Sequence, residues 1–202
     1  MKKQRIRKVT LGVLLAMFAL TAQQPTCNRC SADYISANEL QDYLKRAVAN
    51  GIVDQQVRSV DLGKTQLGIG MVYRGKLLEP ANASVAEHDL VSEVYHVIDG
   101  SATLVTGPDL VDKKRRPADL QTVREFNGPG NNAASIRNGV THHLVAGDVI
   151  IIPAGTGHWF TRIDDHITYL MVRIDPDKAV PLKDEAASRA YLRSAVKKGG
   201  GN

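Results

Sequence analysis

Apolar and polar residues alternate with a period of two over most of the chain after residue 55, which is the pattern of half-buried β-strands. Turn-forming residues separate the alternating runs. Asp99-Gly100 lies between two of these runs and suits the positive dihedral angles of a two-residue hairpin turn. The strands expected from this pattern are 57–62, 66–73, 94–98, 102–105, 142–145, 149–152, 158–163 and 167–174. The sequence therefore predicts an all-β protein built as an antiparallel barrel or sandwich.

One short helix is expected on each side of the strand region. Ser36 and Glu39 have the spacing of a capping box and Gly51 supplies a stop, so the first helix should cover 36–50. A second helix is expected from about 184 to 197, followed by a flexible tail.

Residues 107–139 interrupt the strand pattern with a polar stretch rich in Gly, Asn and Pro. Four consecutive basic residues occur at 113–116 within it. Such a run is most often a solvated surface. We therefore expect a long loop or lid here.

The first 22 residues have the pattern of a cleavable secretory signal peptide. Five basic residues occur among the first eight positions, and the stretch 9–20 is apolar or small. Twelve residues are too few to span a bilayer, which takes about 20. We expect cleavage, no stable membrane anchor afterwards, and a periplasmic or secreted protein.

Net charge at first suggests a nucleic-acid partner, because 26 basic and 21 acidic residues give +5. The segment 1–22 holds five of the basic residues and none of the acidic ones. Its removal leaves a net charge of zero, which excludes binding to nucleic acid through bulk charge.

The two cysteines, Cys27 and Cys30, lie a few residues after the expected cleavage point. Vicinal thiols are oxidised in an export compartment, so a local disulfide is expected. A thioredoxin-like motif needs a strand before it and a helix within it, and a haem-attachment motif needs a His where Ser31 stands.

Three residues that can bind a metal occur at turns between predicted strands: His88, Glu93 and His158. His88 and Glu93 are part of the pattern H-x4-E-x6-G, which ends at Gly100. His158 is the last residue of a second pattern, G-x5-P-x-G-x2-H, which begins at Gly147. These patterns resemble the two signature motifs of the cupin superfamily, G-x5-H-x-H-x3–4-E-x6-G and G-x5-P-x-G-x2-H-x3-N. The resemblance covers about residues 80–165. It implies an antiparallel cupin-type β-barrel, or jelly roll, with short N- and C-terminal helices.

The resemblance also implies a divalent metal inside the barrel, held in the family by two histidines and the glutamate of the first motif and by the histidine of the second. Two positions depart from the motifs: Ala86 stands for the first histidine and Arg162 for the terminal asparagine. The ligands carried over are His88, Glu93 and His158. Two histidines and one carboxylate suit non-haem Fe(II), with Mn, Ni and Zn as alternatives. An empty barrel is the other alternative, since one family ligand is missing.

His88 and Glu93 differ in parity, so they cannot share one face of a continuous strand. Residues 89–92 should therefore turn the chain between them. With that turn, both side chains can point into the barrel.

Strand alternation also identifies the side chains expected to line the pocket. If Glu93 faces inward then Tyr95 does, and if His158 faces inward then Phe160 and Arg162 do. Arg162 could bind a substrate carboxylate or phosphate, or hold its charged end in water.

We favour an exported, metal-dependent cupin enzyme that acts on a small molecule by dioxygenase-type chemistry, or by metal-assisted isomerisation or elimination. The alternative is a non-catalytic cupin module that binds a small molecule. A third hypothesis is a thiol redox protein that uses its two cysteines. The resemblance also allows a homodimer. The expected division is a signal peptide (1–22), an N-terminal segment (23–54), a barrel (55–176) and a C-terminal helix with its tail (177–202).

Overall fold

The computed structural model describes residues 26–27 and 30–194. The predicted signal peptide and the last eight residues lie outside these ranges. The elements in chain order are α1 (Ala37–Ala49), β1 (Asp54–Asp61), β2 (Gln66–Arg74), β3 (Val85–His88), β4 (Ser92–Gly107), β5 (Leu110–Val111), β6 (Lys114–Arg115), the π-helical turn η1 (Val123–Asn127), β7 (Gly130–Ala133), β8 (Ser135–Ile136), β9 (Val140–Val145), β10 (Val149–Ile152), β11 (Gly157–Arg162), β12 (Ile167–Asp175) and α2 (Glu185–Arg193).

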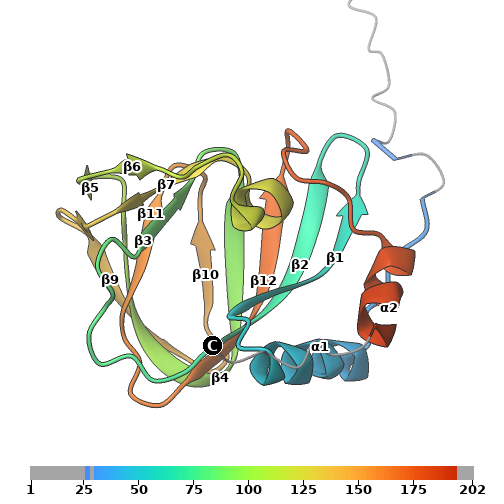
Figure 1. Cartoon of the computed structure of the whole chain (residues 1–202), viewed down its shortest axis with the longest axis horizontal. Helices are drawn as coiled ribbons and strands as arrows, with labels where there is room; N and C mark the ends of the chain where they lie inside the picture. The colour runs from blue at the N-terminus through green and yellow to red at the C-terminus, as the bar shows by residue number, and fades with distance from the viewer. Residues whose placement is uncertain (1–25, 28–29, 195–202) are drawn as a thin grey trace, which may run out of the picture.

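Strand β4 belongs to both walls of the barrel. Its first half pairs with β12 and β10, and its second half pairs with β9 and β11. One wall has the order β1-β2-β12-β4-β10, and the other has the order β9-β4-β11-β3-β7-β6. All of these pairings are antiparallel. The two walls curve around a common interior (Figure 1), as an antiparallel jelly roll requires.

The main core fills the space between the walls. Its buried members come from inward positions of β2, β4, β9, β10, β11 and β12 and from the segments beside them: Val72, Tyr95, Val97, Ala102, Leu104, Leu144, Ile152, Phe160, Ile163, Ile167, Tyr169 and Met171.

The hairpin expected at Asp99-Gly100 is not formed. β4 continues through both residues. Gly100, at φ +76°, pairs with Ile167, and the register with β12 shifts two residues earlier, at Ile98. A Cβ on Gly100 would lie 2.1 Å from the carbonyl oxygen of His166. The positive φ of Gly100 therefore lies inside a long continuous strand, close to the irregularity at Ile98, and the chain does not reverse there.

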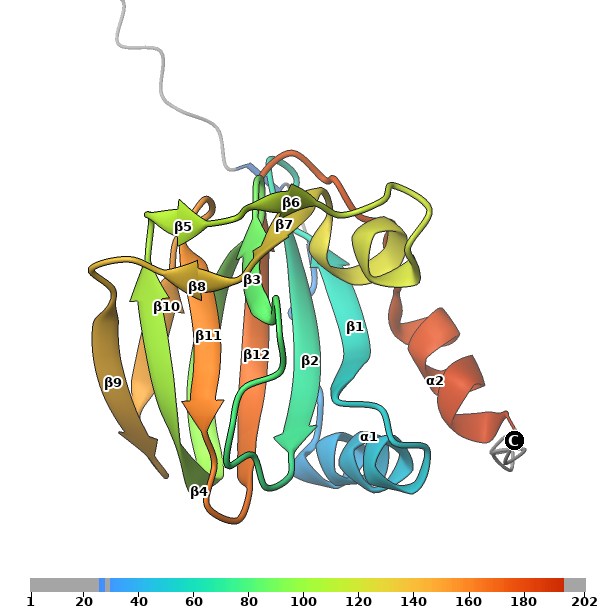
Figure 2. The same ribbon diagram turned by 60° about the vertical axis from the view of Figure 1, so that its left-hand side comes forward.

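The stretch 107–139 contains more regular structure than the expected loop. It forms the short strands β5, β6, β7 and β8 and the turn η1. Figure 2 shows these elements across one end of the barrel, beside β3 and β11. β7 pairs with β3, which gives this stretch regular structure. The sequence did not predict these two strands, because each is too short to show an alternation of apolar and polar residues.

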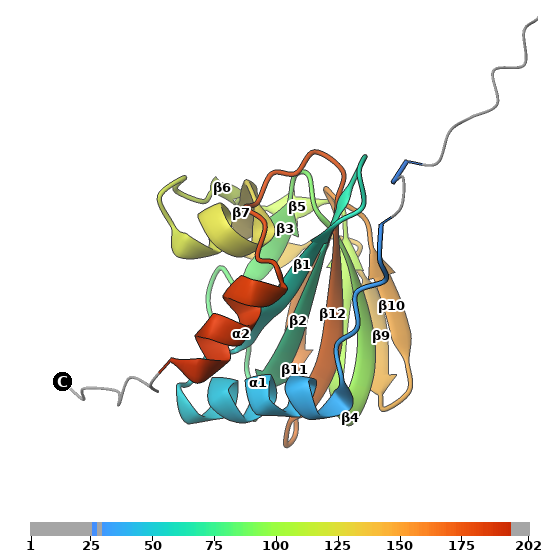
Figure 3. The same cartoon turned by 90° about the vertical axis from the view of Figure 1, so that its right-hand side faces the viewer.

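The first helix agrees closely with the prediction. The side chain of Ser36 accepts a hydrogen bond of 3.1 Å from the backbone N–H of Glu39, and Gly51 adopts a φ of +65° directly after the helix. α1 and α2 lie on the outer side of β1 and β2 (Figure 3). Tyr43, Val57 and Met71 form a second buried cluster there. Within 26–27 and 30–194, no helix has the length and apolar character needed to cross a membrane.

Arg58 fixes the segment before α1 to the sheet. It is fully buried on β1, and its two terminal nitrogens each donate at 2.6 Å, one to Asp33 and one to Glu39. An arginine inside a protein needs such partners, because unpaired burial of its charge is costly.

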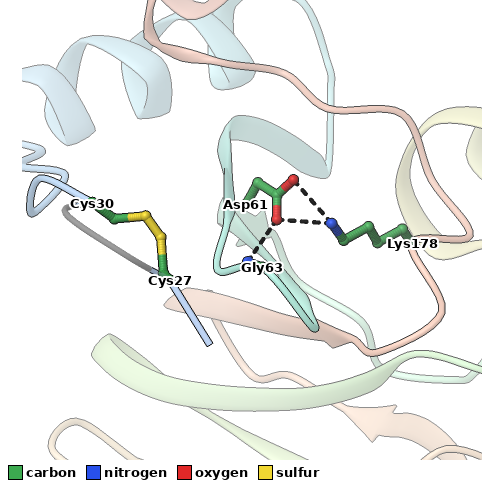
Figure 4. The surroundings of a disulfide bond; sticks show 5 residues. All are labelled: Cys27, Cys30, Asp61, Gly63 and Lys178. Atoms are coloured by element: carbon green, nitrogen blue, oxygen red, sulfur yellow. Dashed lines mark hydrogen bonds and ion pairs between the residues drawn. A yellow bond between two sulfur atoms is a disulfide. The ribbon is translucent and has the colours of Figure 1, made fainter. Parts of the chain in front are cut away.

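The structure pairs Cys27 and Cys30 in the expected disulfide, with their Cα atoms 5.8 Å apart. Figure 4 shows the disulfide beside the turn between β1 and β2. In that turn Asp61 accepts hydrogen bonds from the backbone N–H of Gly63 and from Nζ of Lys178.

Candidate metal centre

The three expected ligands come together in the barrel from three different strands. His88 ends β3, Glu93 is the second residue of β4, and His158 is the second residue of β11. One ligand atom from each lies within 4.8 Å of the others. Their exposed fractions are 4%, 1% and 7%, so the group is enclosed by protein.

The local fold shows why these side chains converge. The chain bends at 89–91, as the parity of His88 and Glu93 predicts, and both residues then face inward. β3 does not pair with β4; instead β11 lies between them and pairs with both, which places His158 between the other two ligands. On β4 the alternation is as expected, since Tyr95 is buried and His96 is exposed.

Glu93 is the centre of the group. Nε2 of His88 lies 3.4 Å from Oε1 of Glu93, and Nε2 of His158 lies 3.5 Å from Oε2. The two imidazole rings are 5.2 Å apart between centroids. Both nitrogens therefore face the same carboxylate, as two ligands of one ion would.

Two further side chains hold the carboxylate of Glu93 in place. The hydroxyl of Tyr95 donates to Oε2 at 2.6 Å. Nε of Arg173, on β12, lies 3.4 Å from Oε1, and the same guanidinium pairs with Asp54 on β1. Arg173 is 2% exposed. A charge-assisted contact of this kind orients a carboxylate and stabilises its ionised form.

The outer nitrogens of the two histidines have different surroundings. Nδ1 of His158 lies 3.4 Å from the carbonyl oxygen of Thr156, to which it can donate. Nδ1 of His88 lies 3.4 Å from a terminal nitrogen of Arg116. Metal-binding histidines usually donate from the ring nitrogen that does not bind the metal to a carbonyl or carboxylate oxygen, as His158 can.

The protonation states suit metal ligands. Burial lowers the pKa of His88 to about 3 and also lowers the pKa of His158. Burial alone would raise the pKa of Glu93, but His88, His158 and Arg173 outweigh it and bring that pKa down to about 2. At neutral pH the group thus offers two neutral imidazoles and one carboxylate, the forms in which these residues bind a metal.

The three pocket candidates have different outcomes. Tyr95 and Phe160 are buried, with ring centroids 6.5 Å apart, and Tyr169 packs 4.4 Å from Tyr95. Arg162 is exposed and pairs with Asp164, so its predicted inward position is wrong. The register of β11 against β4 shifts between Phe160 and Arg162, and this irregularity reverses the alternation.

Sequence reasoning missed Arg116 and Arg173, two arginines that contact the group. Arg173 alternates with Tyr169 and Met171 on β12, so it lies on the inward face of that strand. A charged residue at an inward position is unusual, and this could have indicated a functional residue from the sequence. Arg116 had no such signal, because it follows β6 in the stretch expected to be a solvated loop.

Comparisons with known proteins give remote likenesses. No family model matches the sequence, and no curated protein matches it. The chain is similar to the solved structure of protein BH2720 from Bacillus halodurans (14% identity, 81% of this chain and 98% of the other, TM-score 0.40). It is also similar to a conserved protein with a double-stranded β-helix domain from Klebsiella pneumoniae (16% identity, 63% and 78%, TM-score 0.38). A third likeness is to a sugar phosphate isomerase from a cupin superfamily from Silicibacter pomeroyi (24% identity, 63% and 63%, TM-score 0.33).

The strand order and the positions of the two motifs decide the fold. The first motif spans β3 and the first half of β4, the second spans the turn before β10 through the start of β11, and their ligand residues meet inside the barrel. The chain has the cupin fold. Within this cupin barrel, the His88, Glu93 and His158 group could hold a metal ion.

Proposed function

We propose that this cupin binds one divalent metal through His88, Glu93 and His158 and acts on a small molecule at that metal. The observation that carries the proposal is the convergence of the three ligand atoms within 4.8 Å in a buried site. A metal with three protein ligands keeps open positions for substrate.

The bound metal would supply Lewis acidity and, with iron, access to dioxygen chemistry. We place the reaction in the dioxygenase class, with metal-assisted isomerisation or elimination as the alternative. Tyr95 and Arg173 would hold Glu93 in its ligating orientation through the contacts at 2.6 and 3.4 Å. Tyr169 and Phe160 would exclude water from that side of the ligands, since both are buried against Tyr95.

A non-catalytic small-molecule binder is the second candidate, and Ala86 favours it. This residue occupies the place of the fourth family ligand. A site with one ligand fewer binds metal more weakly, and the barrel could then act as an organic binding cavity alone.

Metal content tests the first candidate. The full-length chain, purified without chelator, should carry about one Fe, Mn, Ni or Zn per molecule by elemental mass spectrometry. Glu93→Gln should remove the metal, whereas Glu79→Gln, at an exposed position outside the site, should keep it. A protein without stoichiometric metal, even after reconstitution, would refute the metal site and favour the binder.

We also propose export, supported by the basic and then apolar pattern of residues 1–20. Expression of the full chain in a bacterial host should yield periplasmic or secreted protein that begins near residue 23. Recovery of the uncleaved chain in the cytoplasm would contradict this.

A further inference from the structure

Arg116 reaches the outer side of the proposed metal ligands from the end of β6. It is 9% exposed, and one terminal nitrogen donates to the backbone carbonyls of Glu87 and Asn131. That same nitrogen lies 3.4 Å from Nδ1 of His88. A guanidinium has only donors, so Nδ1 of His88 can take part only as the acceptor.

This nitrogen of Arg116 has two hydrogens for three acceptors, so His88 shares one of them, and the contact favours one position for the ring hydrogen of His88. An accepting Nδ1 is unprotonated, and the ring hydrogen then sits on Nε2. Nε2 is the nitrogen that faces Oε1 of Glu93 at 3.4 Å, where an N–H can donate to the carboxylate. The contacts on the two sides of the ring therefore favour the same tautomer.

A metal bound at Nε2 requires the opposite tautomer. The hydrogen would have to move to Nδ1, where it would point at the N–H of Arg116. Metal-binding histidines instead direct the outer N–H at a carbonyl or carboxylate. His158 has such an arrangement with the carbonyl of Thr156, so the two histidines differ in their readiness to bind.

We propose that Arg116 is a positioning residue that keeps His88 in the Nε2–H form and thereby weakens metal binding at the site. The metal part of this inference rests on the proposed function. Tight binding then requires Arg116 to move away from His88. Nε of Arg116 is buried and has no hydrogen-bond partner among the described residues, so release of this side chain to water would recover part of the free energy lost on leaving its contacts.

The first test compares Arg116→Gln with Arg115→Gln. The glutamine oxygen can accept from Nδ1–H, while the neighbouring Arg115 is exposed and pairs with Asp89. Zn(II) affinity is measured by competition with a chromophoric chelator. Arg116→Gln should bind about tenfold more tightly than wild type, the lower end of outer-contact effects on metal affinity. Arg115→Gln should match wild type, and unchanged or weaker binding by Arg116→Gln would overturn the proposal.

The second test reads the tautomers directly in the metal-free wild-type protein. Long-range 1H–15N NMR, assigned with His88→Gln, should show His88 protonated at Nε2 and His158 protonated at Nδ1. Protonation of His88 at Nδ1 would overturn the inference whether or not any variant binds metal. The expected tautomers in a protein that binds no metal would instead refute the proposed function and support the role of Arg116 at His88.

Discussion

Ala86 on β3 lies directly opposite His158 on β11 in the register of the sheet. It also precedes His88 by two residues on the same strand, so the two side chains share one face. The residue that departs from the cupin motif thus stands beside the candidate ligands His88 and His158. The position where the cupin motif has its first histidine is therefore part of this site, and here it holds Ala86.

Ala86→His should therefore restore a fourth ligand. Outer contacts alone change metal affinity about 10–100-fold, so a direct ligand should tighten Zn(II) binding by at least about tenfold. Ala86 is partly exposed, which leaves room for the imidazole. Chelator competition measures the affinity, with Leu90→His in the exposed bend as control. Equal affinities for wild type and Ala86→His would show that position 86 does not reach the metal.

Metal-free protein should lose stability as the pH falls below about 6.5. The pKa of His88 is lowered from 6.5 to about 3 by burial, so between these values the unfolded chain binds a proton that the folded chain does not. The free energy of unfolding then decreases with acidification by up to about 1.4 kcal/mol per pH unit for this one group. Glu93, with its pKa lowered to about 2, acts in the same direction below about pH 4.5.

Urea unfolding at pH 7, 6 and 5 checks this dependence. His88→Gln should flatten the slope between pH 6.5 and 5, whereas a variant of the exposed His96 should keep it. An unchanged slope in His88→Gln would contradict the lowered pKa of His88.

Arg58→Met should destabilise the fold by about 3 kcal/mol, because removal of one partner of a buried ion pair leaves the other charge uncompensated. Asp33 and Glu39 would each lose the cation that lies 2.6 Å away, and α1 would lose this ion pair with β1. Lys45→Met, in the exposed pair with Asp42, should change the free energy of unfolding by about 0.5 kcal/mol or less. Similar effects of the two substitutions in urea unfolding would refute the role of Arg58.

Gly100→Ala should cost roughly 3 kcal/mol, from strain at positive φ and from overpacking. The new Cβ would meet the carbonyl of His166 at 2.1 Å. Gly51→Ala has a similar φ of +65° but nothing within 4 Å of its Cβ, so it should show only the strain, about 1 kcal/mol. Equal costs in thermal or urea unfolding would mean that the close approach at Gly100 relaxes.

The period-two alternation predicted most of the barrel, and strands such as 66–73 and 167–174 agree with β2 and β12 within a residue. Ser36 and Gly51 likewise located α1, because capping depends on atoms within one turn. These are local signals. The motif spacing similarly indicated His88, Glu93 and His158 as a group, and the structure brings them within 4.8 Å.

Tertiary structure decided what depends on neighbouring strands. Asp99-Gly100 is a typical turn sequence, but pairing with β12 up to Gly100 and with β9 from Ser101 onward keeps β4 continuous there. Arg162 had inward parity, but a register shift against β4 turned it to solvent. Arg116 appeared to lie in a solvated basic run, yet it is buried against His88. The sequence by itself determined most of the long strands and the first helix, because these follow from short-range periodicity and capping. The candidate ligand residues followed from the resemblance of two motifs to those of the cupin superfamily. Which side chains surround the ligands follows from strand register and long-range packing, and those are set only when the whole barrel closes.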